Sequence, residues 1–596
     1  MSQSSAPFLQ AIVADPHNDT PRLIYADWLD AQGQSTRAEF IRLQCESARL
    51  RKGSPRRQAL ELRADELLFE HESEWLGEKT EQIVRWKFRR GFLHSATMTA
   101  DAFLKHGESV FQTEPLWRLG FTDDEGEPLQ PDALREVVSN PAFRHVRSLD
   151  IIGAAPLNEP HWHNDWSQPP VPLAAWLDAL GHATHVQRLK SFVPGTRLRL
   201  FNEFGEGTGT VASAFEIFCR AEHLRTLSRL DLTGCPLAPA GNSNRLAELV
   251  VNASFAKRLK RLHLDNCRLT DAAAETLATS PNLRNLTQLT LDANKLTRAG
   301  WNALLHSPFL KRLRDFSVSD AGFLLFARSS LAQELRDLRV GWSDDSRSQE
   351  AENAWYELIK TARPPRRLHL VCQDIAPKII ETMATSGWLR NLRSLHIDND
   401  SQSEGFFHTE TIAKLLTTNA APRLCELKTH EFADQDFVRS LDGWHGQKQL
   451  ETLELSDDYF GRSQAHRVLE SPNLSRNLRT LTGIRIQSDD DVASIERCHA
   501  KLTYVALCIA TDLSKKQAEA IFQSSLLKTV ESLRLSFLFS YGQTENISEE
   551  TVRNCLRPLA SPNVLPRLRA FRTYVFGEDP PELMAVKHRL GPRMKS

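Results

Sequence analysis

A six-residue phrase, Leu-x-x-Leu-x-Leu, recurs along most of the chain and constrains the fold more than any other feature. Its clearest copies begin at Leu227, Leu259, Leu286, Leu392, Leu450 and Val530. Weaker copies begin at Leu116, Val146, Val186, Leu313, Leu335, Pro365, Leu424, Leu478, Leu502 and Leu568. A short phrase that returns at intervals near 27 residues indicates one structural unit stacked many times. The sequence therefore predicts an array of about 16 repeats.

Each repeat changes period along its length. Leu262 and Leu264 are two residues apart, so they point to the same face of a short strand. The next segment, LTDAAAETLATSPNL, places Ala274 and Leu277 at helical spacing, and Pro281 ends the helix. A strand followed by a helix that returns to a parallel strand cannot bury its apolar face alone. The pattern predicts an α/β solenoid of parallel strands and helices.

Three successive copies carry a longer motif. LSRLDLTGCPL and LKRLHLDNCRL place Cys235 and Cys267 at one polar position, and LTQLTLDANKL places Asn294 there. This motif resembles the leucine-rich repeats of the ribonuclease-inhibitor type over residues 115–575. The resemblance implies a horseshoe with parallel strands inside and helices outside. It also implies that the Asn/Cys position bonds to backbone between turns, so we interpret these cysteines as packing residues.

Residues 1–82 contain no copy of the phrase and predict a small all-α domain of four helices. The second helix begins at Thr20-Pro21 and ends before Gly33, the third covers about Arg37–Lys52, and the fourth covers Pro55–Trp75. The expected core comprises Phe8, Leu9, Ile12, Leu23, Trp28, Leu29, Phe40, Leu43, Leu67 and Trp75. A polar trio, Asp27, Arg37 and Glu39, predicts a salt-bridged helix turn rather than a catalytic site.

The segment DPHNDTPRLIYADWLDAQGQSTRAEFIRLQ resembles a bacterial N-terminal repeat-companion domain, which precedes repeat arrays in uncharacterised proteins. The resemblance rests on a set of residues spaced through the segment: Asp15, Pro16, Arg22, Leu23, Ala26, Asp27, Trp28, Leu29, Gly33, Arg37, Glu39, Phe40, Ile41 and Gln44. It implies association with repeats and no activity.

The remaining segments flank or interrupt the array. Residues 83–114 contain an aromatic strand, Trp86-Lys87-Phe88, and predict the cap that the open end of a solenoid needs. Residues 576–596 are expected to be a C-terminal tail. Two repeats near the front are long, so each carries an insertion, at 153–185 and 193–215. The first insertion holds His161 and His163, which without a third ligand type predict no metal site.

A partner is expected to bind the concave strand face, where alternate strand residues form exposed columns. The candidate partner-binding residues are Arg229, Arg261, His263, Arg339, Trp342, His369, His396, Lys428, Tyr504 and Arg534. Across two columns, ten Lys/Arg face six Asp/Glu, whereas the whole chain has a net charge of −1. The surplus favours an acidic protein partner. The competing interpretation is a solvated sheet face whose charges serve solubility.

Two other functions remain as alternatives. The segment from Arg42 to Arg63 holds seven Lys/Arg and two Glu, which would suit nucleic acid or an anionic surface. A repeat-containing ubiquitin-ligase-like effector would need a nucleophilic cysteine in a domain behind the repeats, but the last cysteine, Cys555, lies within the array. No catalytic motif of a hydrolase, kinase or metalloprotease occurs, so we predict a non-enzymatic scaffold without cofactors.

Composition and termini indicate the compartment. Nine cysteines without a CxxC pair or zinc-ligand spacing favour reduced thiols. The first residues lack a basic start followed by an apolar run, and no segment approaches the roughly 18 apolar residues of a membrane span. Nearly balanced charge removes the global basic field that nucleic-acid binding usually requires. We predict a cytoplasmic bacterial protein without membrane contact.

Overall fold

The computed structural model shows an α/β chain that divides into two compact units, Met1–Arg312 and Leu313–Ser596. It describes residues 4–50, 55–77, 79, 83–122, 129–150, 173–193, 208–235, 243–335, 337–341, 349–362, 364–371, 377–398, 412, 415–416, 418–429, 435–455, 465–471, 474, 476–498, 500–537, 547–561, 563–568, 570–574, 580–590 and 594–595.

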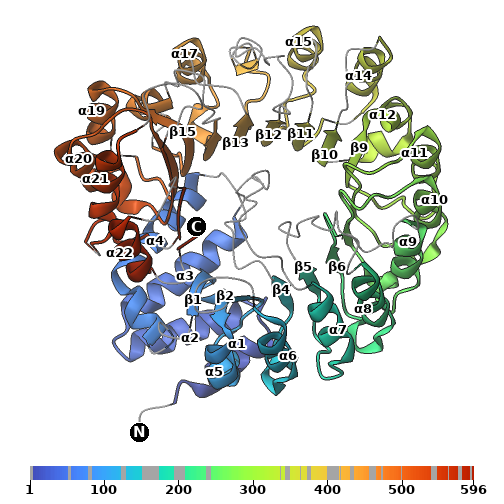
Figure 1. The fold of residues 1–596 in the computed structure, drawn as a ribbon, viewed down its shortest axis with the longest axis horizontal. Coiled ribbons are helices and arrows are strands. Elements are labelled where there is room, and N and C mark those ends of the chain that lie inside the picture. Colours follow the sequence, from blue (N-terminus) through green and yellow to red (C-terminus); the bar gives the residue numbers. More distant parts are fainter. Residues whose placement is uncertain are drawn as a thin grey trace. The chain divides into compact units, whose positions relative to one another are not determined.

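The first unit begins with helices and continues as alternating strands and helices (Figure 1). Its helices are α1 Ala6–Ala14, α2 Thr20–Ala31, α3 Ser35–Arg49, α4 Pro55–Leu76, α5 Ala100–Thr113, α6 Pro131–Ser139, α7 Leu173–His182, α8 Thr208–Arg220, α9 Ser243–Asn252, α10 Asp271–Thr279 and α11 Arg298–Leu305. Its strands are β1 Ile83–Arg89, β2 Phe92–Thr99, β3 Arg118–Thr122, β4 Ser148–Asp150, β5 Ser191–Val193, β6 Arg229–Asp231, β7 Arg261–His263 and β8 Gln288–Thr290.

The second unit alternates in the same way. Its strands are β9 Asp315–Ser319, β10 Asp337–Gly341, β11 Arg367–Val371, β12 Ser394–Asp398, β13 Glu426–Thr429, β14 Thr452–Glu454, β15 Thr480–Ile486, β16 Tyr504–Ile509, β17 Ser532–Phe537, β18 Ala570–Tyr574 and β19 Met594–Lys595. Its helices are α12 Asp320–Ala327, α13 Ser330–Glu334, α14 Gln349–Thr361, α15 Pro377–Thr385, α17 Gln435–Gly443, α19 Asp489–Arg497, α20 Lys515–Gln523, α21 Glu549–Leu559 and α22 Pro581–Leu590.

The repeat phrase forms the strands, and its leucines form the core. In the first unit Leu230, Leu262 and Leu289 align on parallel neighbours β6, β7 and β8, and all three are fully buried. In the second unit the same alignment runs from Phe316 on β9 to Phe571 on β18. Within each unit the strands lie on the inner side and the helices on the outer side (Figure 1). Each unit is therefore a leucine-rich-repeat solenoid, and the predicted fold class is confirmed.

One copy of the phrase was assigned three residues too early. The copy expected at Val186 would place Leu189 in the strand, but the strand is β5, and Phe192 aligns with Leu149 and Leu230. Val186 and Leu189 are also fully buried. Apolar residues at 186, 189 and 192 allow two registers of the phrase, and pairing with both neighbouring strands selects the later one.

The Asn/Cys position bonds the backbone as expected. The Asn294 amide donates to the carbonyls of Leu264 and Leu291, both at 2.8 Å. Its carbonyl oxygen accepts from the N–H of Cys267 at 3.0 Å and of Leu269 at 2.9 Å. One side chain thus satisfies four backbone groups where the chain leaves the strand, and it joins two consecutive repeats.

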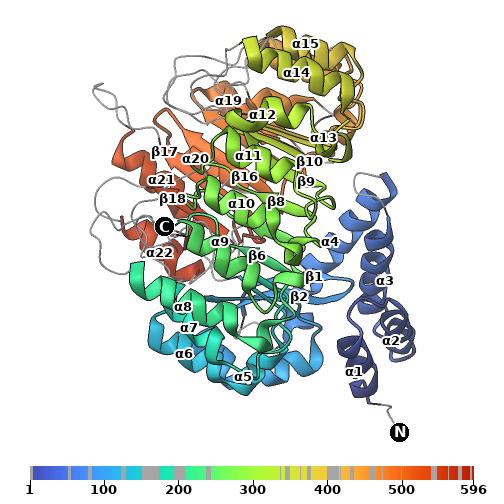
Figure 2. The ribbon, with the colours of Figure 1, turned by 90° about the vertical axis from the view of Figure 1, so that its right-hand side faces the viewer.

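The four N-terminal helices match the expected positions closely, and they lie together as one group in Figure 2. Their buried cluster includes Ile12, Ala26, Leu29 and Ile41, but it also includes Phe92 of strand β2. The helices therefore share their core with the first hairpin, which the sequence had assigned to the cap of the array.

The hairpin turn is anchored in helix α3. Arg90 and Gly91 have φ values of 53° and 83°, as a two-residue turn between antiparallel strands requires. Gly91 donates its N–H to the side-chain oxygen of Gln44 at 2.8 Å, and its carbonyl accepts from Arg37 at 2.6 Å. A Cβ at Gly91 would lie 2.9 Å from the Ile41 Cα, so only glycine allows this approach.

The polar trio of the helical domain does not form one salt-bridged turn. Asp27 pairs with Arg42, and Glu39 pairs with Arg63. Arg37 is instead buried against aromatic rings, with its guanidinium 4.6 Å from the Trp75 centroid. Burial lowers the pKa of Arg37 to about 10, although Glu114 and Tyr25 oppose that shift. The correction follows from helix geometry, since Arg37 and Glu39 are only two residues apart and face different directions.

The end of the array is longer than expected. Residues 576–596 contain helix α22 and strand β19, and β19 pairs with β18 in parallel. The two insertions fall largely at 151–172 and 194–207, and the predictions about His161 and His163 therefore lie outside the described residues. Within the described ranges, every helix is too short or too polar to cross a membrane.

Candidate interaction surface

Four of the candidate residues form one continuous row in the second unit. Arg339, His369, His396 and Lys428 occupy equivalent positions on adjacent parallel strands β10 to β13. Ser317 of β9 begins the row and Glu454 of β14 ends it. All four side chains are partly exposed. Neighbouring strands are about 4.8 Å apart, so the row presents closely spaced polar groups on a rigid sheet. We call these four residues, Arg339, His369, His396 and Lys428, the β10–β13 row.

Contacts within the row divide it into two parts. The imidazoles of His369 and His396 stack with their centroids 3.9 Å apart and their planes inclined by 10°. Lys428, by contrast, is only 12% exposed and lies 2.8 Å from the carboxylate of Glu454 and 3.4 Å from that of Glu426. Burial raises the pKa of Glu454, and Lys428 opposes this rise. Lys428 thus serves first as the counter-ion of a buried carboxylate.

The three candidates of the first unit lie on adjacent strands, and two of them, Arg229 and His263, lie close to acids. Arg229 and Asp231 of β6 form an ion pair at 3.7 Å. His263 aligns with Asp231 and has its Nδ1 3.1 Å from the Thr290 hydroxyl. Burial lowers the pKa of His263, against the opposing effect of Asp231 and Asp265, so its ring is neutral at pH 7. Arg261 is the exposed residue of the three.

The remaining candidates lie away from the β10–β13 row. Tyr504 begins strand β16, and Arg534 on β17 aligns with Arg572 on β18. The side chains of Tyr504 and Arg534 are partly exposed. Trp342, expected as an aromatic anchor, lies outside the described residues.

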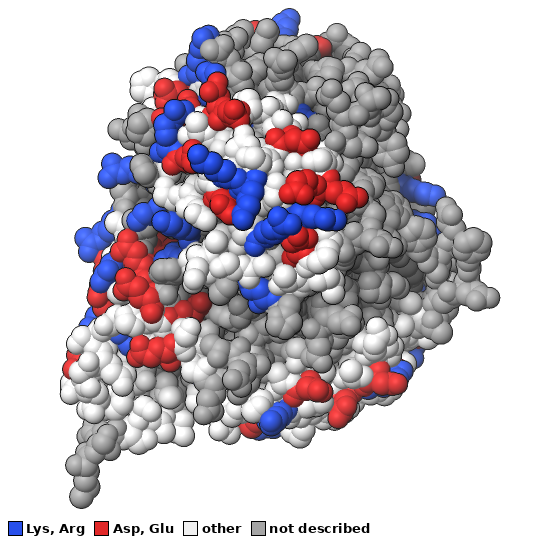
Figure 3. Space-filling view, turned by 60° about the vertical axis from the view of Figure 1, so that its left-hand side comes forward, with Lys and Arg blue, Asp and Glu red and all other residues white. Residues whose placement is uncertain are grey.

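The charge surplus of the columns is smaller than the sequence suggested. Because strand β5 has the later register, Ser191 and Val193 take the positions assigned to Arg188 and Lys190. Eight Lys/Arg then face six Asp/Glu. Several of these groups also neutralise each other across strands, as Lys428 and Glu454 do. Opposite charges are likewise interspersed on the face drawn in Figure 3. The net charge of the two columns is therefore too small to favour an acidic partner, and only the residues of a particular row can do so.

The basic segment from Arg42 to Arg63 is neutralised locally. Its described arginines pair with carboxylates in five places: Arg42 with Asp27 and Asp30, Arg49 with Asp19, Arg56 with Glu46, Arg57 with Glu61, and Arg63 with Glu39 and Glu66. Arg51 and Lys52 lie outside the described residues. A cation held by a carboxylate within the fold attracts a phosphate backbone less strongly.

The cysteines behave as packing residues where they are described. Seven are buried, and Cys425 is partly exposed. The Cys267 thiol lies 3.1 Å from the Leu232 carbonyl. Burial raises the pKa of the thiols of Cys235 and Cys267, and it raises that of Cys555 to about 12. Thiolate is the reactive form, so these groups are inert at neutral pH. Among the described side chains, no three His, Cys, Asp or Glu residues are placed to hold a metal ion.

This arrangement gives a prediction for thiol reactivity. In denaturant without reductant, a disulfide reagent should titrate nine thiols. In the folded protein at pH 8, the thiols of six cysteines should not react within minutes, because burial raises their pKa and leaves little thiolate; they are Cys45, Cys219, Cys235, Cys267, Cys498 and Cys555. A denatured count of seven or fewer would demonstrate disulfides and contradict the reduced state.

A pocket that the sequence did not indicate lies between the helical domain and the first hairpin. It is lined by Pro16, His17, Arg22, Arg89, Arg90, Leu93, His94, Pro115 and Trp117, and we call it the His17 pocket. The space between its lining residues amounts to about 320 Å³, a figure that includes open solvent at its mouth. Three separated segments contribute, and Pro16 and Arg22 are among the residues on which the resemblance to the repeat-companion domain rests. The one signal in the sequence was the density of basic residues after Trp86, at Lys87, Arg89, Arg90 and His94.

No protein-family model and no curated protein matches the sequence. Among solved structures, the chain is similar to an internalin from Listeria monocytogenes, with 15% identity and a TM-score of 0.24 over 60% of this chain and 83% of that chain. It is similar to the TLR13–ssRNA13 complex, with 13% identity and a TM-score of 0.23 over 79% of this chain and 56% of that chain. It is also similar to a protein from Bacteroides fragilis, with 12% identity and a TM-score of 0.23 over 52% of this chain and 73% of that chain. These likenesses are too weak to bear on this chain's partner or activity.

Proposed function

We propose that the chain is a non-enzymatic scaffold that binds a protein on the concave face of its repeats. The observation that carries this proposal is the β10–β13 row, in which Arg339 and the stacked His369 and His396 are partly exposed on three adjacent strands. A fixed row of partly exposed polar groups on a rigid sheet suits recognition of another surface. Arg339, His369 and His396 are all basic residue types on adjacent strands, which favours a carboxylate-bearing partner.

The finer assignments belong to the same proposal. We assign residues 1–82 to a bacterial repeat-companion domain, 83–114 to the cap and 115–575 to repeats of the ribonuclease-inhibitor type. We also place the protein in the cytoplasm, where its cysteines would stay reduced. Support comes from the motif residues of the sequence and from the four backbone bonds of Asn294.

The test is to replace Arg339, His369 and His396 of the row with glutamate. The variant Arg339→Glu, His369→Glu, His396→Glu leaves Lys428 in place, because reversing Lys428 would leave Glu454 buried without a counter-ion. The matched control is Arg328→Glu, Lys360→Glu, Lys378→Glu, three exposed positions on or next to outer helices α12, α14 and α15. Circular dichroism checks that both variants fold.

We expect at least one protein that co-purifies with the parent chain to co-purify in equal amount with the control. Its recovered amount should fall about tenfold or more with the row variant. Its retention should fall as salt rises, since the contact is between charges. The same set of retained proteins for parent, control and row variant would move the binding surface off the row. Loss of the partner after nuclease treatment would instead favour nucleic acid.

The alternative through residues 42–63 is not supported to the same degree. Each described arginine of that segment already has a carboxylate partner within the helical domain. Reversal of Arg56 and Arg57 tests it directly: labelled oligonucleotide should bind parent and variant equally weakly. Salt-dependent binding that this reversal abolishes would restore the alternative.

A further inference from the structure

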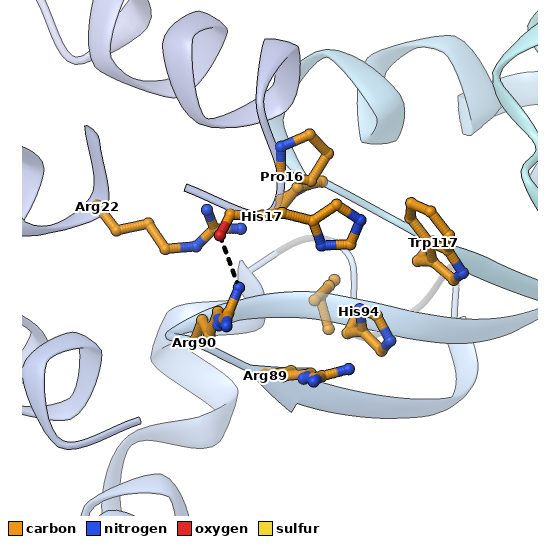
Figure 4. Close-up of a pocket in the computed structure, with 9 residues that line it drawn as sticks. Pro16, His17, Arg22, Arg89, Arg90, His94 and Trp117 are labelled. Carbon is orange, nitrogen blue, oxygen red and sulfur yellow. Dashed lines mark hydrogen bonds between the residues drawn. The ribbon is translucent and has the colours of Figure 1, made fainter. Parts of the chain in front are cut away.

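The His17 pocket has a basic lining built from three parts of the first unit (Figure 4). Pro16, His17 and Arg22 come from helix α2 and the turn before it. Arg89, Arg90 and His94 come from the β1–β2 hairpin, and Pro115 and Trp117 precede strand β3. Three arginines and two histidines thus line the pocket, and no Asp or Glu belongs to its lining.

The positive charge of this lining is only partly compensated. The carboxylate of Asp19 lies 3.3 Å from Arg90, but Asp19 also holds Arg49 at 2.7 Å. Arg90 further donates to the carbonyl of His17 at 2.8 Å, the contact drawn in Figure 4. The side chain of Arg89 has neither a hydrogen bond nor an ion pair with any described residue, and the same is true of the His94 ring. The Asp19 carboxylate is therefore shared between Arg90 and Arg49 and does not neutralise all the cationic donors of the pocket.

Arg22 supplies an independent sign of an unfilled site. The residue is only 2% exposed, and one of its terminal nitrogens donates to the Asn18 carbonyl at 2.9 Å. Its Nε has no hydrogen-bond partner among the described residues. Asp15 and Asp19 act on it from a distance, while its guanidinium packs 5.7 Å from the Phe92 centroid. A buried guanidinium N–H without an acceptor is costly unless a ligand provides one.

The two imidazoles experience the same field. Burial lowers the pKa of His17, and Arg90, Lys190, Arg147 and Arg89 lower it further. Burial likewise lowers the pKa of His94 to about 4, with contributions from Arg89, Lys87, His17 and Arg118. The charged groups with the largest effects on the two rings are all basic. An anion in the pocket would relieve this repulsion and stabilise both protonated rings.

We propose that the His17 pocket binds the phosphate group of a small ligand through Arg22, Arg89, His17 and His94. A tetrahedral oxyanion can accept hydrogen bonds from several sides at once, and guanidinium forks suit it. Trp117 forms one wall of the pocket, with its ring centroid 4.9 Å from that of His17, 5.2 Å from Lys190 and 5.5 Å from Arg147. The site would connect the helical domain to the first hairpin, because both contribute donors. It does not depend on the partner proposed for the β10–β13 row.

The test uses the full chain and isothermal titration with inorganic phosphate and with O-phosphoserine, which separate free phosphate from a phosphate monoester. We expect saturable binding of at least one probe at a single site. Arg89→Gln should weaken binding about tenfold or more, since it removes a charge-assisted donor that has no structural partner. The matched control Arg284→Gln, an exposed arginine elsewhere in the first unit, should change the affinity less than about twofold.

Three results would overturn the proposal. They are no saturable binding of either probe, equal loss in Arg89→Gln and Arg284→Gln, or tighter binding of citrate than of both phosphate probes. Sulfate tests the imidazoles, because its own charge does not change between about pH 7.5 and 5.5. Affinity for sulfate should rise as the pH falls across this range, since the bound anion raises the pKa of His17 and His94. A flat profile would contradict the role of the two rings.

Discussion

Replacing Leu262 with alanine should lower the free energy of unfolding by about 2 to 5 kcal/mol, as truncation of a buried leucine does. Leu262 is fully buried and aligned between Leu230 and Leu289, so the change opens a cavity between consecutive repeats. Urea unfolding followed by circular dichroism measures the total loss. Amide hydrogen exchange in β6 to β8 should show that the loss spreads to the neighbouring repeats, because each repeat is stabilised by its neighbours.

The matched control lies on the same strand. Arg261→Ala changes an exposed side chain beside Leu262, so it should change stability by no more than about 0.5 kcal/mol. If Leu262→Ala and Arg261→Ala melt within a degree of each other, the register of the repeat is wrong.

The second large effect is expected at the hairpin turn. Gly91→Ala should destabilise the helical domain by about 2 to 5 kcal/mol, because a Cβ at φ 83° is strained and would also collide with Ile41. The comparison variant is Gly33→Ala, with φ 78° and no atom within 4 Å of the added Cβ. It isolates the backbone strain, expected to cost about 1 to 2 kcal/mol.

Protection of the amides of α1 to α3 from hydrogen exchange provides the measurement for this pair. Gly91→Ala should lower that protection clearly more than Gly33→Ala. Equal effects would show that the turn does not pack against helix α3 as described.

The sequence predicted the repeats well because their signal is redundant. A strand that fits one copy of the phrase must also align with copies on both sides, and the leucines from 230 to 289 do so. The four N-terminal helices were predicted because proline and glycine mark their ends, as Pro21 and Gly33 do. The one misplaced copy lay where apolar residues at 186, 189 and 192 satisfied two registers at once.

The candidate site was harder to predict because its chemistry depends on neighbours across strands. Counting charges in the columns treated Lys428 as available to a partner, although its aligned neighbour Glu454 was already present in the same column. The His17 pocket depends on contacts between residues about 70 positions apart, such as His17 and Arg90. No spacing rule in the sequence connects such residues. Only the docking of the hairpin against helix α3 brings them together.

That docking limits how the N-terminal helices can be moved between proteins. A fusion that joins residues 1–82 to another repeat array would leave behind Phe92, which completes the helical core, and Gly91, whose carbonyl accepts from the buried Arg37. The transferable cassette therefore ends after strand β2, at Thr99. Because β2 pairs with β3, any array that receives this cassette must offer a first strand in the same register. The helices and the hairpin thus form one structural module, and a junction within the hairpin would separate each from the residues that stabilise it.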